Sequence, residues 1–375
     1  MLAGEASGDI LGASVLQALR LRHPDLVVEG IGGPLMQAQG LSSLFPMERL
    51  SVMGFVEPLK RLPELLRIRR AVLRYFSDNP PDLFLGIDSP DFNLPLEQKL
   101  RARGQLTAHL VSPSIWAWRQ GRIRRIERAV DLMLCLFPFE TKTYAAHGVP
   151  ARFVGHPLAD EISVQDPAVA RRAPGLPPGA SVVALLPGSR AEEVRRLGPL
   201  FLGAARLLRH RVPGLEFVIP AANSARRAEL QAQLAQFGDL SVRLIAGRSR
   251  EVLAASDAAM LASGTATLEA ALLHRPMVVA YRMGGLSWQL LKRLVTTPYA
   301  ALPNILSGQA LVPELLQEAA TPAALAAALQ PLLDNSAAAT AQRAGFAQIH
   351  SALGQGFGDT AALALLTVLE ERQHG

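Results

Sequence analysis

Cysteine is almost absent from this sequence, since Cys135 is the only one in 375 residues. A single thiol cannot close a disulfide within the chain, which is typical of proteins from a reducing compartment. Cys135 lies in the apolar run 132–137, without a basic neighbour that would lower the pKa of its thiol. We therefore expect a buried, inert side chain and not a nucleophile.

Long hydrophobic runs are missing as well. No uninterrupted apolar segment reaches the roughly 20 residues that span a bilayer, and the start lacks a basic stretch followed by an apolar one. We expect a cytoplasmic protein that is neither exported nor integral to a membrane.

Several nucleotide and metal motifs do not occur. Without a G-x-G-x-x-G, binding of NAD or FAD is not supported, and there is no Walker P-loop. Neither H-E-x-x-H nor a D-x-D that would hold a metal against a diphosphate is found. The sequence thus predicts no cofactor and no metal, and leaves backbone N–H groups and arginine to stabilise a leaving diphosphate.

Apolar and basic residues are what the chain does contain. Hydrophobic residues make up 49% and charged residues 19%, with a mean hydropathy of +0.20, so we expect a large core, and the length suits two domains. Thirty-eight Lys and Arg against 32 Asp and Glu give a net charge of +6. This balance favours an anionic partner, although a basic surface without a ligand has the same composition.

Short apolar runs alternate with longer amphipathic ones, the pattern of parallel strands joined by crossover helices. The expected strands cover residues 83–87, 107–111, 132–137, 182–186, 216–219, 242–245, 258–261 and 277–281. This pattern predicts an α/β fold with two doubly wound halves.

Residues 164–180 interrupt that pattern with prolines and glycines, which end helices and central strands. We place an interdomain linker there, between a first domain at 1–163 and a second at 181–375. Only helices are expected after residue 313, and one of them could return to the first domain.

Ligands in open parallel sheets bind beyond the carboxyl ends of the strands. Asp88 follows the expected strand 83–87, and Pro90 with the buried strand would hold its carboxylate where an acceptor hydroxyl can reach it. We therefore propose Asp88 as a general base. Asp91, three residues on, is a candidate helix cap instead.

Two loops in the second half have the character of anion sites. Residues 187–190 contain Gly188, Ser189 and Arg190, which offer a close backbone approach, a cap and a fork of donors for phosphate. An ordinary strand-to-helix turn is the alternative. The second loop opens a helix with small residues, a natural cradle for a diphosphate. Its candidates are Ser263, Gly264, Thr265 and, for a ribose or as part of a cap, Glu269.

The opening segment 3–9 is a further Gly/Ser loop that leads into a helix. We take Glu5, Ser7 and Asp9 in it as candidate substrate contacts.

Two stretches are rich in arginine. In residues 60–76, apolar and basic side chains recur at helical spacing, so this helix could lie on an anionic membrane surface or pack on the sheet with solvated arginines. The candidate membrane contacts are Leu62, Leu65, Leu66, Arg67, Arg70 and Phe76. Residues 116–128 add five arginines beside two tryptophans, but no nucleic-acid motif accompanies either stretch.

Seven runs resemble the family of lipid-A-disaccharide synthases, and they spread over nearly the whole chain. They are AGEASGD (3–9), GIDSPDFN (86–93), VSPSIWAWRQ (111–120), LLPGSR (185–190), ASGTATLE (262–269), YRM (281–283) and LPN (302–304).

The resemblance implies a GT-B fold, two Rossmann-like domains facing a cleft. It implies transfer from the donor UDP-2,3-diacylglucosamine to the 6-hydroxyl of the acceptor 2,3-diacylglucosamine 1-phosphate, at the cytoplasmic surface of the inner membrane and without nucleic acid. By the same resemblance, Asp88 is the catalytic base, Arg190 and Glu269 contact the nucleotide, and Asn304 is a further substrate contact. Oligomeric state is not fixed, and a homodimer stays open.

The chain departs from the family pattern at its start, because family members have a short apolar strand before AGEASGD and here only Met1 and Leu2 precede it. We expect either a late start or a missing first strand. Two rival functions remain. One is a UDP-sugar 2-epimerase of the same architecture, and the other is a peripheral membrane-binding or RNA-binding protein that uses the arginine stretches.

Overall fold

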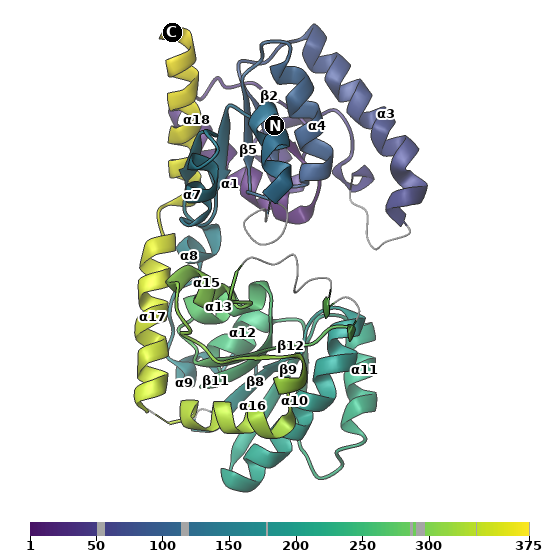
Figure 1. The fold of residues 1–375 in the computed structure, drawn as a ribbon. Coiled ribbons are helices and arrows are strands. Elements are labelled where there is room, and N and C mark those ends of the chain that lie inside the picture. Colours follow the sequence, from purple (N-terminus) through teal and green to yellow (C-terminus); the bar gives the residue numbers. More distant parts are fainter. Residues whose placement is uncertain are drawn as a thin grey trace. The chain divides into compact units, whose positions relative to one another are not determined.

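The computed structural model describes residues 1–50, 57–113, 120–177, 179–285, 288–289, 297–334 and 336–374. The chain divides into two compact units (Figure 1). The first unit comprises Met1–Asp160 and Leu353–Gly375, and the second comprises Glu161–Ala352.

The first unit is built on a five-stranded parallel sheet in the order β1-β4-β5-β6-β7. Its strands are β1 (Leu2–Ala3), β4 (Phe84–Ile87), β5 (Thr107–Leu110), β6 (Leu132–Cys135) and β7 (Ala151–Phe153). A small parallel pair, β2 (Val28–Gly30) and β3 (Leu41–Ser43), lies beside it. Its helices are α1 (Ala6–Arg22), α2 (Pro34–Ala38), α3 (Glu57–Asp78), α4 (Pro90–Arg101), α6 (Ile123–Ala129), α7 (Glu140–Ala145), α8 (Pro157–Glu161) and α18 (Phe357–His374).

The first strand is present, although it is only two residues long. Leu2 and Ala3 pair with Gly86 and Ile87 of β4. On the other side, the N–H of Ala3 donates to the carbonyl of Ile31 at 2.8 Å. The expectation that this strand is missing is therefore wrong. Through these bonds β1 connects β2 with β4, so the strand order reverses at β1, as in a doubly wound sheet.

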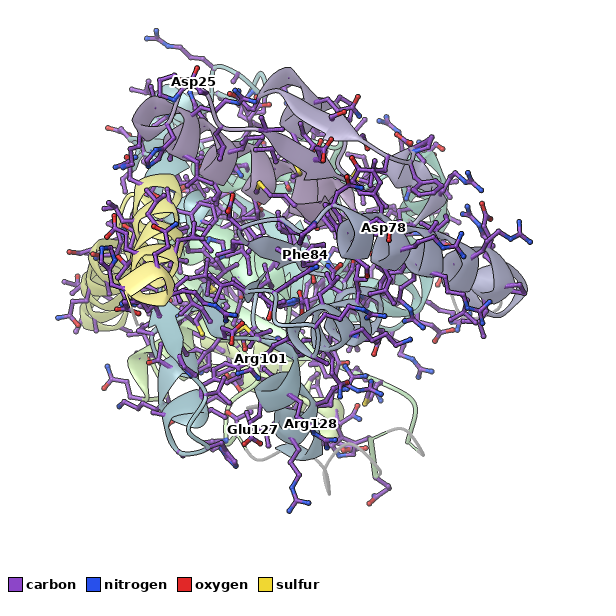
Figure 2. All side chains as sticks on the ribbon, turned by 90° about the horizontal axis from the view of Figure 1, so that it is seen from above. Asp25, Asp78, Phe84, Arg101, Glu127 and Arg128 are labelled. Atoms are coloured by element: carbon purple, nitrogen blue, oxygen red, sulfur yellow. The ribbon has the colours of Figure 1, made fainter. Side chains whose placement is uncertain are left out.

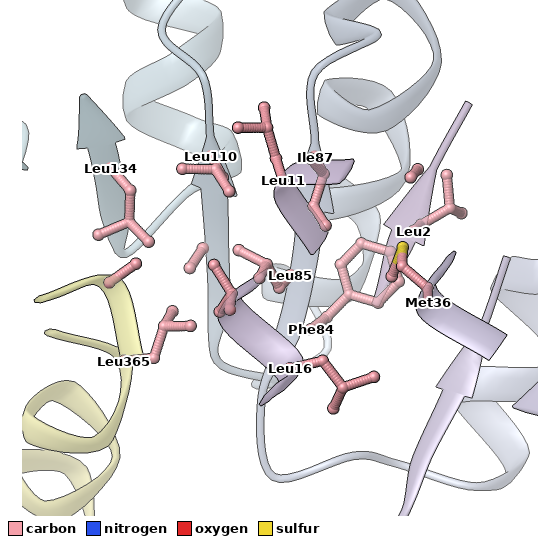
Figure 3. Packing of buried hydrophobic residues seen from close by; sticks show 14 of the residues in the cluster. Leu2, Leu11, Leu16, Met36, Phe84, Leu85, Ile87, Leu110, Leu134 and Leu365 are labelled. Carbon is pink, nitrogen blue, oxygen red and sulfur yellow. The ribbon is translucent and has the colours of Figure 1, made fainter. Parts of the chain in front are cut away.

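The core of the first unit lies between this sheet and its helices (Figure 3). Leu16 of α1, Phe84 of β4 and Leu365 of α18 are part of one buried cluster. The last helix of the chain thus belongs to the first unit. Cys135 is buried and free, and burial raises the pKa of its thiol.

The second unit contains a six-stranded parallel sheet in the order β10-β9-β8-β11-β12-β13. Its strands are β8 (Ser181–Leu186), β9 (Leu215–Ala221), β10 (Arg243–Ala246), β11 (Ala258–Ala262), β12 (Met277–Tyr281) and β13 (Glu314–Leu316). Its helices are α9 (Pro167–Ala170), α10 (Ala191–Arg211), α11 (Ser224–Leu234), α12 (Ser249–Ala254), α13 (Thr265–Leu272), α15 (Leu302–Ser307), α16 (Pro322–Leu329) and α17 (Ala337–Leu353). The order reverses between β8 and β11, which marks the carboxyl ends of these two strands as a ligand position.

The boundary between the units lies earlier than the sequence suggested. Residues 164–180, which we expected to be a linker, belong to the second unit. They include α9, and Leu176 among them is buried. Proline here begins a short helix at Pro167, with Asp166 as its cap, because proline suits the first turn of a helix.

Residues 337–374 are apolar and long enough to cross a membrane by length and composition alone. In the structure they form two helices, because α17 ends at Leu353 and α18 begins at Phe357. Phe357, Ala361 and Leu365 are buried in the core of the first unit. These contacts account for the apolar character of α18.

Candidate active site

Residues with positive φ angles gather at the carboxyl ends of β4 and β5 in the first unit. Asp88 and Ser89 have φ angles of 52° and 44°, and Val111 after β5 has 80°. Side chains other than glycine rarely adopt these angles, which persist where the surrounding structure imposes them and cluster at functional sites. The Asp88 side chain is half-buried and has no hydrogen-bond partner among the described residues. A carboxylate at this position is free to accept a proton from a ligand.

Asn93, one turn into α4, fixes the backbone at Asp88. It is fully buried, and its Nδ2 donates to the carbonyl of Asp88 at 2.9 Å, with longer contacts to the carbonyls of Ile87 and Leu2. One amide group therefore joins the ends of β1 and β4. Sequence reasoning placed Asn93 in a distinctive run but gave it no role.

Glu97 of α4 and His109 of the neighbouring strand β5 form a buried pair. Glu97 Oε1 lies 2.7 Å from His109 Nδ1, and neither side chain is exposed. Burial raises the pKa of Glu97, while His109 acts in the opposite direction. Gly86 makes room for this pair, because a Cβ there would lie 1.9 Å from Glu97 Oε1.

The opening loop divides into two parts with different roles. Glu5 and Ser7 are exposed at the start of α1, directly beyond β1, where first-turn N–H groups are unpaired. Asp9 is buried, and its carboxylate accepts N–H groups from Gly33, Leu35 and Met36 at 2.9 to 3.0 Å. Asp9 therefore caps α2, and the prediction that it contacts substrate is corrected.

In the second unit, the loop after β8 presents Arg190 to solvent, with 83% of its side chain exposed. Gly188 has a φ of 120°, and a Cβ there would lie 2.4 Å from Glu193. Glu193 Oε2 accepts the N–H groups of Ser189 and Arg190 at 3.0 and 3.2 Å. Glu193 Oε1 lies 3.2 Å from Arg190 Nη1.

A carboxylate thus occupies the donors that we expected to hold phosphate. Sequence reasoning missed Glu193, although a cap followed three residues later by Glu is a recognised helix start. Tyr281, at the end of β12, interacts electrostatically with both Glu193 and Arg190. Burial raises the pKa of Tyr281, Glu193 adds to that effect and Arg190 opposes it.

The small-residue loop after β11 opens α13. Gly264 and Thr265 are exposed, whereas Ser263 Oγ donates to the carbonyl of Ala300 at 2.7 Å. Glu269 does not cap this helix. It lies 3.8 Å from Arg250 of α12, and burial raises its pKa while Arg250 lowers it.

Asn304 is buried and fully engaged within the protein. Its Nδ2 donates to Val312 O and to Glu314 Oε1, and its Oδ1 accepts the N–H of Val312, all at 2.8 to 2.9 Å. These bonds hold the segment before β13. The prediction that Asn304 contacts substrate is therefore corrected to a structural role.

Helix α3 carries the predicted membrane contacts, and one of them is corrected. Phe76 is only 3% exposed and packs edge-on against Phe84 at 5.5 Å. Leu62 is 47% exposed, Leu65 and Leu66 are half-buried, and Arg67 and Arg70 are exposed. The C-terminal half of α3 thus packs on the core, and an apolar and basic surface is left nearer its start.

The second arginine stretch lies partly outside the described residues, because 114–119 are not among them. Its remaining part forms α6, where Glu127 and Arg128 are exposed at the outer surface (Figure 2). Arg122 pairs with Asp91 at 3.0 Å. Asp91 therefore forms an ion pair in the first turn of α4 instead of capping it.

Solved structures with the same architecture define the class of protein. The calicheamicin glycosyltransferase CalG4 matches with a TM-score of 0.58 and 18% identity, over 99% of this chain and 96% of that one. MurG from Acinetobacter baumannii matches with a TM-score of 0.54 and 14% identity, over 97% of each chain. A UDP-GlcNAc 2-epimerase from Neisseria meningitidis, bound to UDP-GlcNAc, matches with a TM-score of 0.60 and 13% identity, over 96% of each chain. These similarities show a GT-B fold.

The sequence relatives are more specific. A lipid-A-disaccharide synthase from Pseudomonas aeruginosa strain UCBPP-PA14 is 57% identical over 99% of this chain and 98% of its own length. The enzyme of the same name from Pseudomonas putida strain GB-1 is 53% identical, with the same coverage. The family profile described as lipid-A-disaccharide synthetase matches residues 1–368. The chain belongs to the lipid-A-disaccharide synthase family, and its role is that of a glycosyltransferase, a hexosyltransferase of lipid A disaccharide synthesis that uses a UDP-sugar donor.

Proposed function

We propose that this chain joins UDP-2,3-diacylglucosamine to 2,3-diacylglucosamine 1-phosphate. The products are the β-1,6-linked lipid A disaccharide 1-phosphate and UDP. The observation that carries the catalytic part is the Asp88 carboxylate, which lies at a strained strand end and has no partner among the residues that the structure describes.

In this proposal Asp88 accepts the proton of the acceptor's 6-hydroxyl as that oxygen attacks the anomeric carbon. The bond from the anomeric carbon to the UDP oxygen breaks on the opposite face, so the configuration inverts. UDP leaves without protonation if donors stabilise its charge. General-base catalysis by a positioned side chain typically contributes about 10²- to 10⁴-fold.

We assign the donor's diphosphate to the second unit, at the carboxyl ends of β8 and β11. The exposed Arg190 guanidinium and the loop N–H groups of Ser189, Gly264 and Thr265 support this assignment. Since Glu193 accepts the Ser189 and Arg190 N–H groups in the structure, the diphosphate would take these donors from it. Glu269 remains our candidate for a nucleotide contact, and Glu5 and Ser7 remain candidates on the acceptor side.

The catalytic assignment is tested with Asp88→Asn. We expect kcat to fall by about 10²- to 10⁴-fold, because the amide cannot accept the proton, while UDP binding is retained. The assay weighs the lipid product by mass spectrometry with both substrates supplied. Asp82→Asn, an exposed aspartate just before β4, is the matched control. Near-normal turnover of the Asp88→Asn enzyme would refute the role.

An epimerase remains the rival of another reaction class, because a UDP-GlcNAc 2-epimerase has the same fold. The two functions differ in their need for an acceptor. Our proposal requires that UDP appears only when the diacylglucosamine 1-phosphate is present. Conversion of UDP-sugar without any acceptor would favour the epimerase.

We further propose that the enzyme works in the cytoplasm at the surface of the inner membrane, with the start of α3 in contact with lipid. The exposed Leu62, the half-buried Leu65 and Leu66, and the exposed Arg67 and Arg70 support this contact. The acylated substrates of the proposed reaction reside in the surface of a membrane. A homodimer is compatible with this proposal, and sedimentation measurements would decide it.

A further inference from the structure

A cavity of about 400 Å³ lies in the second unit, away from the loops assigned to the donor. Asp257 directly precedes β11, and Arg275 comes shortly before β12, so the cavity lies at the amino ends of these strands. The donor loops lie at the carboxyl ends of β8 and β11. The residues that line the cavity are Asp166, Pro167, Ala168, Arg171, Asp257, Arg275 and Arg343.

Arg275 is a buried cation that forms no direct ion pair with the described residues. It is 6% exposed, and its Nη2 donates to the carbonyl of Ala254 at 2.9 Å and to that of Gln165. Its Nε is buried and has no hydrogen-bond partner in the part of the chain that the structure describes. Among the residues that the structure describes, no carboxylate lies within 4.0 Å of its guanidinium. A buried charge is costly unless an opposite charge pairs with it.

The two carboxylates at the cavity already have partners. Asp257 Oδ2 accepts Arg171 Nη2 at 2.6 Å and the N–H of Val182 at 2.7 Å. Asp166 Oδ1 accepts the N–H of Ala168 and caps α9. Three guanidinium groups against two carboxylates leave the cavity with an excess of one positive charge.

The charge balance also affects the pKa of Arg275. Burial lowers this pKa to about 10; Asp257 and Asp166 oppose the effect, and Arg343 and Arg171 add to it. The side chain is still protonated at neutral pH. Its positive charge is therefore present in a place where burial disfavours it.

We propose that this cavity binds a small phosphate-bearing anion, either inorganic phosphate or a phosphomonoester. Guanidinium groups are suited to phosphate oxygens because several N–H donors lie in one plane. The lining arginines come from α9, from the segment before β12 and from α17, so they approach the anion from separate elements. The cavity volume exceeds what a single monatomic ion would fill, which favours a polyatomic anion.

A bound anion would connect elements that are far apart in sequence. Arg171 ends α9 in the segment that enters the second unit, and Arg343 belongs to its last helix. An anion that contacts both, together with Arg275, holds the beginning and the end of this unit to its sheet. Binding to the folded state alone stabilises that state.

The experiment uses the full-length protein with Arg190→Ala, which removes a phosphate ligand from the donor loops. Thermal unfolding is followed as inorganic phosphate replaces chloride at constant ionic strength. We expect the melting temperature to rise with phosphate. Arg275→Met in the same background should abolish the rise, because it removes the unpaired guanidinium. Arg209→Met, an exposed arginine of α10, is the charge-matched control and should keep the full response.

A second variant covers the case in which Arg275→Met does not fold. Arg343→Gln removes a half-buried lining guanidinium and should weaken the phosphate response several-fold. The proposal is overturned if phosphate has no effect beyond chloride. It is also overturned if every folded variant responds as its parent does.

The source of the phosphate group is determined separately. Vesicles of phosphatidic acid are compared with vesicles of phosphatidylcholine, and calorimetric titration with inorganic phosphate is run beside them. An Arg275-dependent response to phosphate in solution indicates a free ion or soluble phosphomonoester. A response to phosphatidic acid alone, lost in the same variants, indicates a lipid headgroup. Because none of these measurements uses turnover, a failure here leaves the proposed reaction untouched.

Discussion

Asn93 has more influence on the candidate base than its position inside α4 suggests. Its side-chain amide donates to the carbonyl of Asp88, and weaker contacts reach Ile87 and Leu2. These bonds hold the backbone that bends at Asp88 and Ser89, where φ is positive. A buried polar group in this position holds the backbone that carries the carboxylate we propose as the base.

We expect Asn93→Ala to lower kcat by about 10-fold or more while the KM for the donor changes little. Loss of buried hydrogen bonds should also reduce the free energy of unfolding by about 1–3 kcal/mol. Steady-state kinetics and denaturant titration measure the two effects. Asn79→Ala is the control, because Asn79 bonds only within its own exposed helix end. An unchanged kcat in a folded Asn93→Ala protein would contradict the positioning role.

Glu193 competes with the diphosphate for the same N–H groups in our assignment. Glu193→Gln removes the negative charge and weakens its hold on Arg190. We expect a several-fold lower KM for the UDP-sugar donor. Glu192→Gln, which alters an exposed neighbour paired with Arg196, is the control. A higher KM in Glu193→Gln would show that the carboxylate supports the loop and does not compete with the donor.

At the scale of elements, the two halves of α3 differ in what they expose. Ile68, Val72 and Phe76 are buried at helical spacing and fasten the helix to the core. Leu62 is exposed beside exposed arginines. An apolar and basic surface of this kind suits an anionic lipid layer.

The membrane contact predicts that Leu62→Ser combined with Leu66→Ser weakens binding to anionic vesicles several-fold. Leu363→Ser is the control, because Leu363 is 52% exposed on α18 and is not part of this surface. Vesicle sedimentation at low and high salt measures the binding. The α3 arginines imply that salt weakens it, because exposed charges are screened. An equal loss of vesicle binding in the Leu363→Ser variant would mean that binding does not depend on the α3 surface.

The sequence predicted elements better than it predicted side-chain roles. All eight expected strands are present, and most of them are buried parallel strands, which are continuous apolar runs with clear ends. The three-residue β7 and β13 were missed, since such short edge strands have little pattern to detect. The linker was misplaced because the same prolines that end one helix begin α9.

The position of a site residue could be predicted where it depends only on the end of a strand. Asp88 and Arg190 lie, as expected, in the loops after the buried strands β4 and β8, and their roles stay predictions. Asp9 and Asn304 carry groups that suit a ligand equally well, but they bond to N–H and carbonyl groups from distant segments. Only the tertiary structure brings those partners within reach, so the sequence could not separate a structural role from a binding role.

At the scale of the whole molecule, His156 makes stability depend on pH. Burial lowers its pKa to about 4, although nearby Asp160 acts in the opposite direction. Its Nδ1 accepts the N–H of Leu158, and its backbone N–H donates to Leu353 beside α18. The neutral ring is therefore the form that fits the folded protein.

The unfolded state binds a proton on His156 near its ordinary pKa of about 6.5, whereas the folded state binds it only near pH 4. The neutral His156 ring therefore makes its full contribution to the free energy of unfolding above about pH 6.5. This contribution, at most about 3 kcal/mol, is lost as the pH falls toward 4. Denaturant titrations across this range measure it. His156→Gln should flatten the dependence, and an equally steep curve in that variant would assign the effect to other groups.

The first unit contains both ends of the chain, and the second unit is an insertion between residues 160 and 353. A ribosome therefore releases the second unit with all of its sequence before the first can close. Until α18 emerges, the leucines and phenylalanines that it covers stay open to water and to chaperones. Loss of α18 would leave Asp88, our proposed base, on a sheet that lacks part of its core.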